Sequence, residues 1–280
     1  MASAAKKEPD VFDDMKAVLE FYSALGYERM PVKLSVEGLP KPERPAGHTA
    51  KISGRGSARV GEAKERYAAP PKKETTAPVA PKRIAARTTG PSAAERAEAL
   101  AALREEIGDC RRCKLSAQRT NIVFGEGNPA ARLMFIGEGP GKEEDLQARP
   151  FVGEAGLLLT KLIEKMGLSR DEVYIGNIIK CRPPMNRDPE PDETAACRGF
   201  IERQIEIIRP DIIMTLGRIA LQALLQKPDL KITALRGKFI DYNGIHVMPT
   251  FHPAYLLRNP GDKWKTWADA QKVMSLLGIS

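Results

Sequence analysis

Arg132-Leu133-Met134-Phe135-Ile136-Gly137-Glu138-Gly139-Pro140-Gly141 joins four consecutive apolar residues to a glycine-rich turn. An unbroken apolar run of this length predicts a strand that is buried on both faces. The segments 173–178 and 211–216 have a similar apolar character. Because strands of this kind occur mainly in parallel sheets that helices cover on both sides, the chain is predicted to have a parallel sheet at its centre.

Helical patterns alternate with these strands. Ser92 and Glu95 are spaced as a capping box for a helix that runs to about Ile107. Further helices are predicted at about 153–166, 192–208, 218–225 and 264–277, and further strands at 238–241 and 245–249. The alternation predicts an α/β fold over residues 92–280, a three-layer α/β/α sandwich around a short, mostly parallel sheet. Functional sites in such folds gather at the carboxyl ends of the strands, which here are followed by the loops 137–141, 177–186 and 249–260.

The first 91 residues differ from this domain in composition. Residues 1–27 carry apolar side chains at helical spacing and predict one amphipathic helix, which we expect to dock on the main domain or on a protein partner. Residues 28–91 are rich in Pro and Ala and predict a disordered basic linker. The chain has a formal net charge of +8, and residues 28–90 hold fourteen Lys and Arg against six Asp and Glu. Such an arm either attracts a polyanion such as DNA or serves as a solvated tether.

The sequence also bears on where the protein acts. No apolar run approaches the length of a membrane span, so no contact with a membrane is expected. The start Met1-Ala2-Ser3-Ala4-Ala5-Lys6-Lys7-Glu8 lacks the apolar core of a secretory signal. We therefore expect a cytoplasmic monomer, associated with the nucleoid in a prokaryote.

The chain has four cysteines, Cys110, Cys113, Cys181 and Cys197, in the pattern C-x2-C, sixty-seven intervening residues, then C-x15-C. Disulfides need an oxidising compartment, which the expected location does not provide. Zinc usually takes two short C-x2-4-C knuckles, whereas an iron–sulfur cluster accepts irregular spacing because its thiolates converge from separate loops. The spacing favours an iron–sulfur cluster and leaves zinc and unliganded thiols as alternatives.

Four further stretches are distinctive in combination. They are Gly137-Glu138-Gly139-Pro140-Gly141-Lys142-Glu143-Glu144-Asp145, Arg149-Pro150-Phe151-Val152-Gly153, Asn177-Ile178-Ile179-Lys180-Cys181-Arg182-Pro183-Pro184 and Phe251-His252-Pro253-Ala254-Tyr255-Leu256-Leu257-Arg258. With the four cysteines in order, they closely resemble the family 4 uracil-DNA glycosylases, the iron–sulfur branch of that superfamily. The resemblance runs from about Ile107 to the C-terminus and does not reach residues 1–90. It implies a [4Fe–4S] cluster on Cys110, Cys113, Cys181 and Cys197.

The resemblance further implies a DNA repair enzyme that acts on DNA containing uracil. Such a hydrolase flips deoxyuridine out of the stack, hydrolyses the N-glycosidic bond, releases uracil and leaves an abasic site. Phe151 matches the platform on which the family stacks the base, and Asn177 matches the residue that reads it. An amide donates to uracil O4 and accepts from N3–H, whereas cytosine presents the opposite polarity at both atoms. Cytosine would leave buried groups unpaired, at about 1–3 kcal/mol each.

The segment around His252 is similar to the family's His-Pro loop. The resemblance implies that His252 donates a hydrogen bond to O2 of the departing uracil, an interaction of about 3–4 kcal/mol in the transition state. After it, Leu256 is expected to wedge into the duplex and fill the space of the flipped base. Arg258 is expected to meet a phosphate.

The residue that activates the attacking water is less clearly marked. Other branches of the superfamily place Asp or Asn two residues after the first glycine of the turn, but here that position is Gly139, which is expected to let the backbone approach the flat base. Glu138 and Glu144 are the candidate carboxylates, and Asn186 is expected to help position the water. The resemblance also points to Glu144 at the wall that excludes the 5-methyl group of thymine.

The sequence leaves three other functions open. The first is a catalytically weak or covalent uracil-DNA-binding protein, although those relatives carry a histidine-bearing insertion and Leu235-Arg236-Gly237-Lys238-Phe239 has no histidine. The second is an iron–sulfur electron carrier, which would leave Phe151, Asn177 and His252 unexplained. The third is a scaffold protein that uses the N-terminal helix and the basic arm. For the cluster itself, both a loop-fixing role and a redox role are open.

Overall fold

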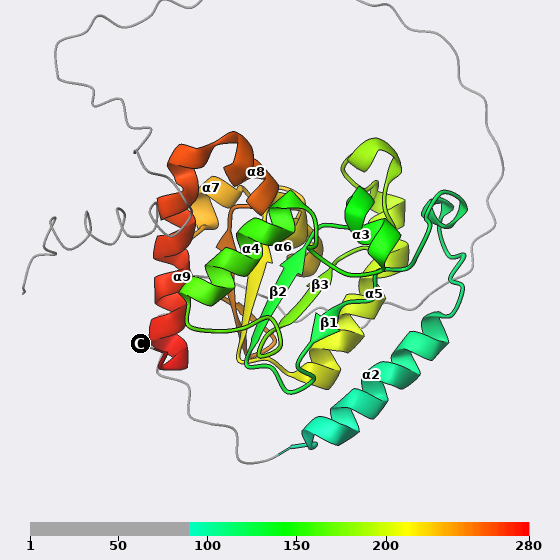
Figure 1. Cartoon of the computed structure of the whole chain (residues 1–280), viewed down its shortest axis with the longest axis horizontal. Coiled ribbons are helices and arrows are strands. Elements are labelled where there is room, and N and C mark those ends of the chain that lie inside the picture. The colour runs from blue at the N-terminus through cyan, green and yellow to red at the C-terminus, as the bar shows by residue number, and fades with distance from the viewer. Residues whose placement is uncertain (1–89, 280) are drawn as a thin grey trace, which may run out of the picture. The chain divides into compact units, whose positions relative to one another are not determined.

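The computed structural model of the chain describes residues 90–279. The helix expected over residues 1–27 and nearly all of the linker expected over 28–91 lie outside the described residues. The described part has one six-stranded sheet with helices against both of its faces (Figure 1). The predicted α/β/α sandwich is confirmed.

The sheet is parallel at its centre and antiparallel at both edges. Its strand order is β1-β3-β2-β4-β6-β5. The strands are β1 (Glu126–Gly127), β2 (Leu133–Gly137), β3 (Tyr174–Asn177), β4 (Ile212–Leu216), β5 (Ile240–Tyr242) and β6 (Ile245–Thr250). The neighbours β3-β2-β4-β6 pair in parallel, whereas β1 and β5 pair antiparallel with β3 and β6. The four central strands therefore end at the same edge of the sheet.

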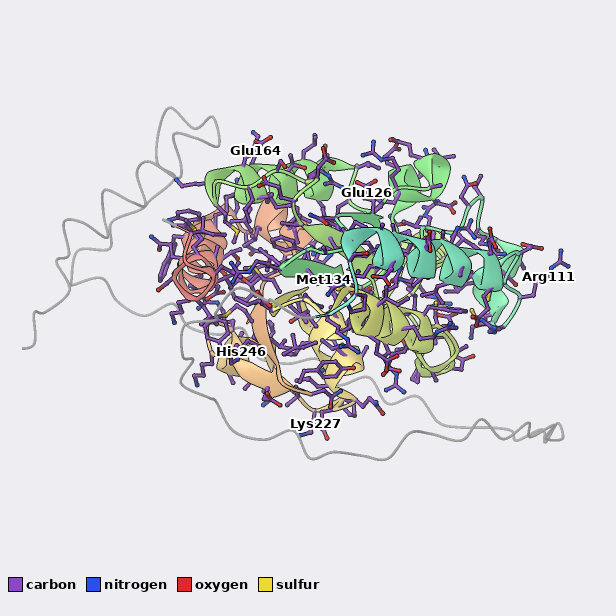
Figure 2. All side chains as sticks on the ribbon, turned by 90° about the horizontal axis from the view of Figure 1, so that it is seen from below. Arg111, Glu126, Met134, Glu164, Lys227 and His246 are labelled. Carbon is purple, nitrogen blue, oxygen red and sulfur yellow. The ribbon has the colours of Figure 1, made fainter. Side chains whose placement is uncertain are left out.

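Helices cover the two faces of the sheet in separate groups. One face packs against α2 (Ala93–Ile107), α5 (Pro191–Ile208) and α6 (Arg218–Leu225), and the other against α4 (Glu154–Lys165) and α9 (Lys263–Leu277). Successive residues of β2 point to opposite faces, so Met134 belongs to the first core and Phe135 to the second. Figure 2 shows Met134 between the layers, in contrast to Arg111, which projects into solvent.

The helix boundaries follow the local sequence signals. The predicted capping box is present: Glu95 N–H donates to Ser92 Oγ at 3.2 Å, and Ser92 N–H donates to Glu95 Oε2 at 2.7 Å. Several short elements were not predicted, because a helix of one or two turns is too short to show a hydrophobic period. These are α3 (Lys142–Gln147), α7 (Ile232–Leu235), α8 (Pro253–Arg258) and the 3-10 turns Lys114–Ala117, Pro184–Asn186 and Pro260–Asp262.

The short elements α3 and α8 and the turn Pro184–Asn186 follow the carboxyl ends of β2, β6 and β3. The three loops expected to carry function therefore lie at one edge of the sheet. Among the helices of residues 90–279, none is long and apolar enough to cross a membrane.

Candidate active site

Gly137 and Asn177 are partners in the register of β2 and β3, at the carboxyl ends of both strands. A Cβ atom built on Gly137 would lie 2.4 Å from Asn177 Oδ1 and 2.5 Å from Phe151 Cζ. Both side chains therefore close over the backbone of Gly137, and only glycine leaves room for them. The pairing brings together two residues that are 40 positions apart in the sequence.

The side chain of Asn177 is buried without a full set of partners. The residue is 1% exposed, and its Oδ1 has no hydrogen-bond partner among the described residues. A buried acceptor without a donor costs about 1–3 kcal/mol, and such groups are rare in folded proteins. A ligand with a hydrogen-bond donor would therefore satisfy this oxygen.

Phe151 is held in a strained backbone conformation. Its φ is 53°, in the left-handed region that non-glycine residues rarely adopt, and its side chain is buried. Arg170 Nη1 donates to its carbonyl at 3.0 Å, and Glu144 Oε1 accepts from Val152 N–H and Gly153 N–H at 2.9 Å. Strain that several contacts maintain is typical of functional sites.

Glu144 is thus engaged in positioning the Phe151 loop through the two amides that follow it. Gly156 contributes to the same fit, since a Cβ atom there would lie 2.0 Å from the carbonyl carbon of Phe151. Both amides bind Oε1 and leave Oε2 free of them, so the two roles expected for Glu144 stay predictions beside this positioning role.

His252 stands at the N-cap of α8, where its Nδ1 accepts a hydrogen bond from Ala254 N–H at 3.1 Å. In the neutral imidazole the proton is therefore on Nε2, which leaves Nε2–H as a donor. Burial, with a further contribution from the positive charge of Arg258, lowers the pKa of His252 to about 4, and Glu144 opposes the shift. The ring is consequently neutral at physiological pH.

His252 lies beside the other site residues. Its ring centroid is 5.8 Å from that of Phe151. A Cβ atom on Gly217, directly after β4, would lie 2.9 Å from His252 Cβ. Gly217 was not predicted as a site residue, although its place after the apolar run 211–216 is a signal that could have identified it. Residues at the ends of β2, β3, β4 and β6 therefore meet in one site.

Glu138 follows β2 directly and is half-buried. Burial raises the pKa of Glu138 to about 7, the negative charge of Asp188 adds to the shift, and Arg218 opposes it. No hydrogen bond holds its carboxylate among the described residues. A carboxyl group with this pKa is suited to accept a proton near neutral pH.

The remaining predicted site residues are placed differently. A Cβ atom on Gly139 would lie 2.6 Å from Ile179 Cγ1, so glycine is required there for packing. Asn186 is exposed and its Oδ1 accepts from Arg182 Nε at 2.7 Å. No hydrogen bond or ring contact of the described residues joins Asn186 to Phe151 or His252.

The prediction for Leu256 needs a correction. Leu256 is 3% exposed and packs with Leu158 and Phe251, because the short helix α8 turns this side chain towards α4. A residue that wedges into DNA must be accessible, and the neighbouring Leu257 is 39% exposed. Arg258 is exposed, as its expected contact with a phosphate requires.

The four cysteines line one pocket, and none is in a disulfide. Three cations and four apolar residues complete its lining: Arg112, Arg119, Lys180, Ile107, Ile122, Ala196 and Phe200. Among the described residues, no three His, Cys, Asp or Glu side chains are gathered closely enough to hold a single metal ion.

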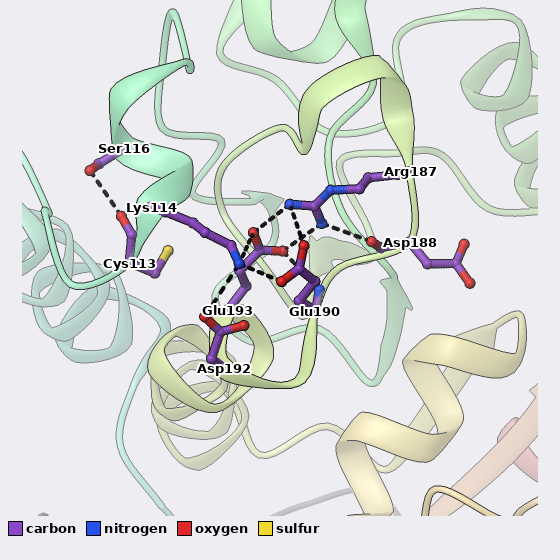
Figure 3. Close-up of polar contacts among 8 residues, drawn as sticks. All are labelled: Cys113, Lys114, Ser116, Arg187, Asp188, Glu190, Asp192 and Glu193. Atoms are coloured by element: carbon purple, nitrogen blue, oxygen red, sulfur yellow. Dashed lines mark hydrogen bonds and ion pairs between the residues drawn. The ribbon is translucent and has the colours of Figure 1, made fainter. Parts of the chain in front are cut away.

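An ion network ties the two cysteine-bearing segments together (Figure 3). Lys114, next to Cys113, pairs with three carboxylates at the start of α5, Glu190, Asp192 and Glu193. The carboxylate of Glu193 is fully buried, and Arg187 donates to both of its oxygens at 2.6 and 2.8 Å. Because α5 also carries Cys197, the network holds one side of the cysteine pocket against the other.

Comparison with known proteins gives a consistent result. The family model of the uracil DNA glycosylase superfamily matches residues 124–272. A protein of Thermotoga maritima named "Type-4 uracil-DNA glycosylase" is 48% identical over 185 residues, which cover 65% of this chain and 96% of that protein. Proteins of the same name are 50% identical over 181 residues in Saccharolobus solfataricus and 46% identical over 187 residues in Sulfurisphaera tokodaii. These two matches cover 62% and 64% of this chain, and 84% and 85% of the relatives.

Replacement of Arg187 by Met should destabilise the protein, because it leaves the buried carboxylate of Glu193 without its cation. The loss should be smaller than that of a fully buried pair, since the Arg187 side chain is 33% exposed. Arg187 lowers the pKa of Glu193, so the contribution is present above the ordinary pKa of 4.5 and is lost as the pH falls through the lower value of the folded state. Denaturant unfolding at several pH values measures the difference.

The matched control is Arg203→Met, which removes an ion pair with Glu106 whose two side chains are 46% and 48% exposed. It should lower the free energy of unfolding less than Arg187→Met does at pH 7, because exposed ion pairs contribute little. Equal unfolding midpoints for Arg187→Met and the unchanged protein at pH 7 would contradict the structural role of the network.

Proposed function

The chain belongs to the uracil DNA glycosylase superfamily, and we propose that the residues at the carboxyl edge of its sheet excise uracil from DNA. The enzyme is a uracil-DNA glycosylase, a hydrolase of DNA repair that releases uracil and leaves an abasic site. The assignment of the site rests on the buried Oδ1 of Asn177, which has no hydrogen-bond partner among the described residues. It lies beside the Phe151 ring and on the same sheet edge as the Nε2–H of His252.

Recognition of the base would use Phe151 and Asn177. A base flipped out of the duplex would stack on Phe151, and its N3–H would supply the donor that Asn177 Oδ1 lacks. The Nδ2 atom of the same amide would donate to O4. Cytosine has no donor at N3 and an amino group at C4, so both interactions would be lost and the buried amide would be left unpaired.

Bond cleavage would use His252. As the bond between C1′ and N1 breaks, its electron pair moves onto uracil and negative charge develops at O2. Because the pKa of His252 is lowered to about 4, the ring is neutral, and its Nε2–H donates to that oxygen as a hydrogen bond. A donor that is already in place needs no reorganisation during the reaction.

The water would be activated by Glu138, which follows Gly137 at the end of β2. Water attacks C1′, its oxygen forms the new bond to the sugar, and one of its protons passes to the Glu138 carboxylate. The pKa of Glu138, raised to about 7, makes this transfer favourable near neutral pH. Glu144 would support the site by holding the Phe151 loop and by bounding the space next to the base, which excludes the 5-methyl group of thymine.

The cysteine pocket fits a [4Fe–4S] cluster. In a cluster each thiolate binds a different iron, whereas a zinc ion needs all four sulfurs at about 2.3 Å from one point. The basic side chains around the thiols suit an anionic group such as a metal–thiolate cluster. When bound by Cys110, Cys113, Cys181 and Cys197, the cluster would supply iron–thiolate bonds that hold the loop before β1 to the segment after β3. No step of the excision passes through it.

Contact with the duplex would involve α8. Its exposed Leu257, in place of the buried Leu256, would fill the position that the flipped nucleotide leaves, and Arg258 would meet a phosphate. A cytoplasmic location and a monomeric state are part of the proposal, and a protein partner of residues 1–27 is a further expectation.

The defining experiment uses the full chain with its iron content measured. We expect it to cleave a labelled oligonucleotide at a single uracil after alkali treatment, and to leave the same oligonucleotide with cytosine intact. Absence of cleavage by iron-loaded protein would contradict the proposed excision activity. A trapped species that migrates more slowly would instead favour the covalent binder.

The variants Asn177→Ala and His252→Ala should each lose most of the excision rate, about 10²–10³-fold for His252→Ala because it removes the donor to O2. Single-turnover kinetics measure the loss. Both should keep the visible absorbance of the cluster, and a colourless variant would show that the residue has a structural role.

The excision rate should fall about tenfold per pH unit below about 7, because a Glu138 carboxylate with a raised pKa must be ionised to accept the proton from water. This fall is the acidic limb of the pH–rate profile. His252 should not contribute to it, since its pKa is lowered to about 4. The Glu138→Gln variant should excise uracil more slowly, and its rate should lack the acidic limb.

The control for this profile is Asp188→Asn. It removes a negative charge that raises the pKa of Glu138 and should therefore move the limb to lower pH. A limb near pH 7 that persists in Glu138→Gln would assign the titration to another group.

Leu257→Ala should lower excision from double-stranded DNA more than from single-stranded DNA, because only the duplex has a vacated position to fill. Leu256→Ala should instead lower the unfolding midpoint, since it removes a buried side chain. A strand-dependent loss in Leu256→Ala alone would restore the original assignment of the wedge.

A further inference from the structure

Lys180 has a fully buried ammonium group between the cysteine pocket and Asn177. The residue is 1% exposed. Its Nζ donates to the carbonyl of Asn177 at 2.9 Å and to Gln204 Oε1 at 2.6 Å. Its own backbone N–H donates to Cys197 Sγ at 3.2 Å. One residue therefore contacts both the candidate base reader and a candidate cluster ligand.

The charge of Lys180 has no acidic partner in the part of the chain that the structure describes. Within residues 90–279, no Asp or Glu forms an ion pair with it, and the neighbours that act on its charge are the thiols of Cys197 and Cys181. A buried ammonium without a counter-charge is strongly unfavourable in a protein interior. A metal group held by four thiolates is anionic, and would supply the missing negative charge.

The position of Lys180 is fixed by a second layer of hydrogen bonds. Gln204 Nε2 donates to the carbonyl of Phe124 at 2.9 Å and to the hydroxyl of Tyr174 at 3.0 Å. These bonds orient the amide so that its oxygen faces Lys180 Nζ. The ammonium group is thus held against the backbone of Asn177 and cannot turn to another acceptor without breaking this arrangement.

Arg119 provides an internal comparison. Its side chain is 6% exposed, its Nη1 donates to the carbonyl of Cys110 at 2.6 Å and lies 3.4 Å from Cys181 Sγ. It also pairs with Asp109 at 2.6 Å. Arg119 is therefore a cation at the same pocket, but it has its own acidic partner and no contact with Asn177.

We propose that Lys180 is a positioning residue that balances the negative charge of the metal–thiolate group and holds the Asn177 peptide in the orientation that reads uracil. The inference rests on the proposed function and on the proposed cluster. It gives the cluster an effect on specificity that passes through charge and hydrogen bonding and involves no electron transfer.

The test compares Lys180→Met with Arg119→Met in the full chain, with equal iron and sulfide content. Two quantities are measured: the reduction potential of the cluster, and the affinity for DNA with a 2′-fluorinated deoxyuridine, which resists hydrolysis, relative to the same DNA with cytosine. Both variants should have a lower reduction potential, because each removes a cation beside an anionic group. Only Lys180→Met should lose uracil preference, by about tenfold or more, as expected for one misplaced hydrogen-bonding group.

The variant Lys180→Gln separates the charge of Lys180 from its hydrogen bond to the Asn177 carbonyl. It also replaces Lys180→Met in the test if that variant does not retain its cluster. It keeps a donor for the Asn177 carbonyl and removes the charge, so it should lower the potential and retain more uracil preference than Lys180→Met. Lys180→Arg should keep the potential.

An unchanged uracil preference in Lys180→Met, or an unchanged potential in Lys180→Met where Arg119→Met shifts it, would overturn the inference. Failure of the unchanged protein to excise uracil or to bind iron would overturn the proposed function instead.

Discussion

The parallel pairing of β2 with β3 places Gly137 opposite Asn177, and the geometry of the site depends on this pair. The absence of a side chain on Gly137 lets Asn177 and Phe151 approach over one backbone atom. A second glycine, Gly217, does the same for His252 after β4. Because parallel strands end at one edge, residues from four strands meet there without any long loop to carry them.

The candidate active site and the cysteine pocket have different electrostatic environments, and Lys180 contacts both through the Asn177 carbonyl and Cys197 Sγ. In the candidate active site, His252 is neutral and the pKa of Glu138 is about 7. At Cys181 the surrounding pocket carries cations, among them Lys180. The first environment suits a reaction in which charge develops on a base, and the second suits a permanent anionic group.

This contrast bears on the alternative functions. An electron carrier or a scaffold would need only the cysteine pocket or the surface. Neither would account for a strained φ at Phe151, an unpartnered buried oxygen on Asn177, or a histidine whose one free nitrogen carries a proton. Such features are costly for stability, and they occur together at one edge of the sheet.

The local sequence by itself determined every strand of the described sheet except the two-residue edge strand β1, the capped helix from Ala93 to Ile107, and the loops that carry Phe151, Asn177 and His252. Periodicity, capping residues and glycine turns act over a few residues. It did not determine that Leu256 is buried and Leu257 exposed, that Glu144 binds the amides after Phe151, or that Gly217 contacts His252. Those facts depend on which distant segments pack together. Burial, which raises the pKa of Glu138 and encloses the ammonium group of Lys180, exists only after the sheet and its helices have assembled.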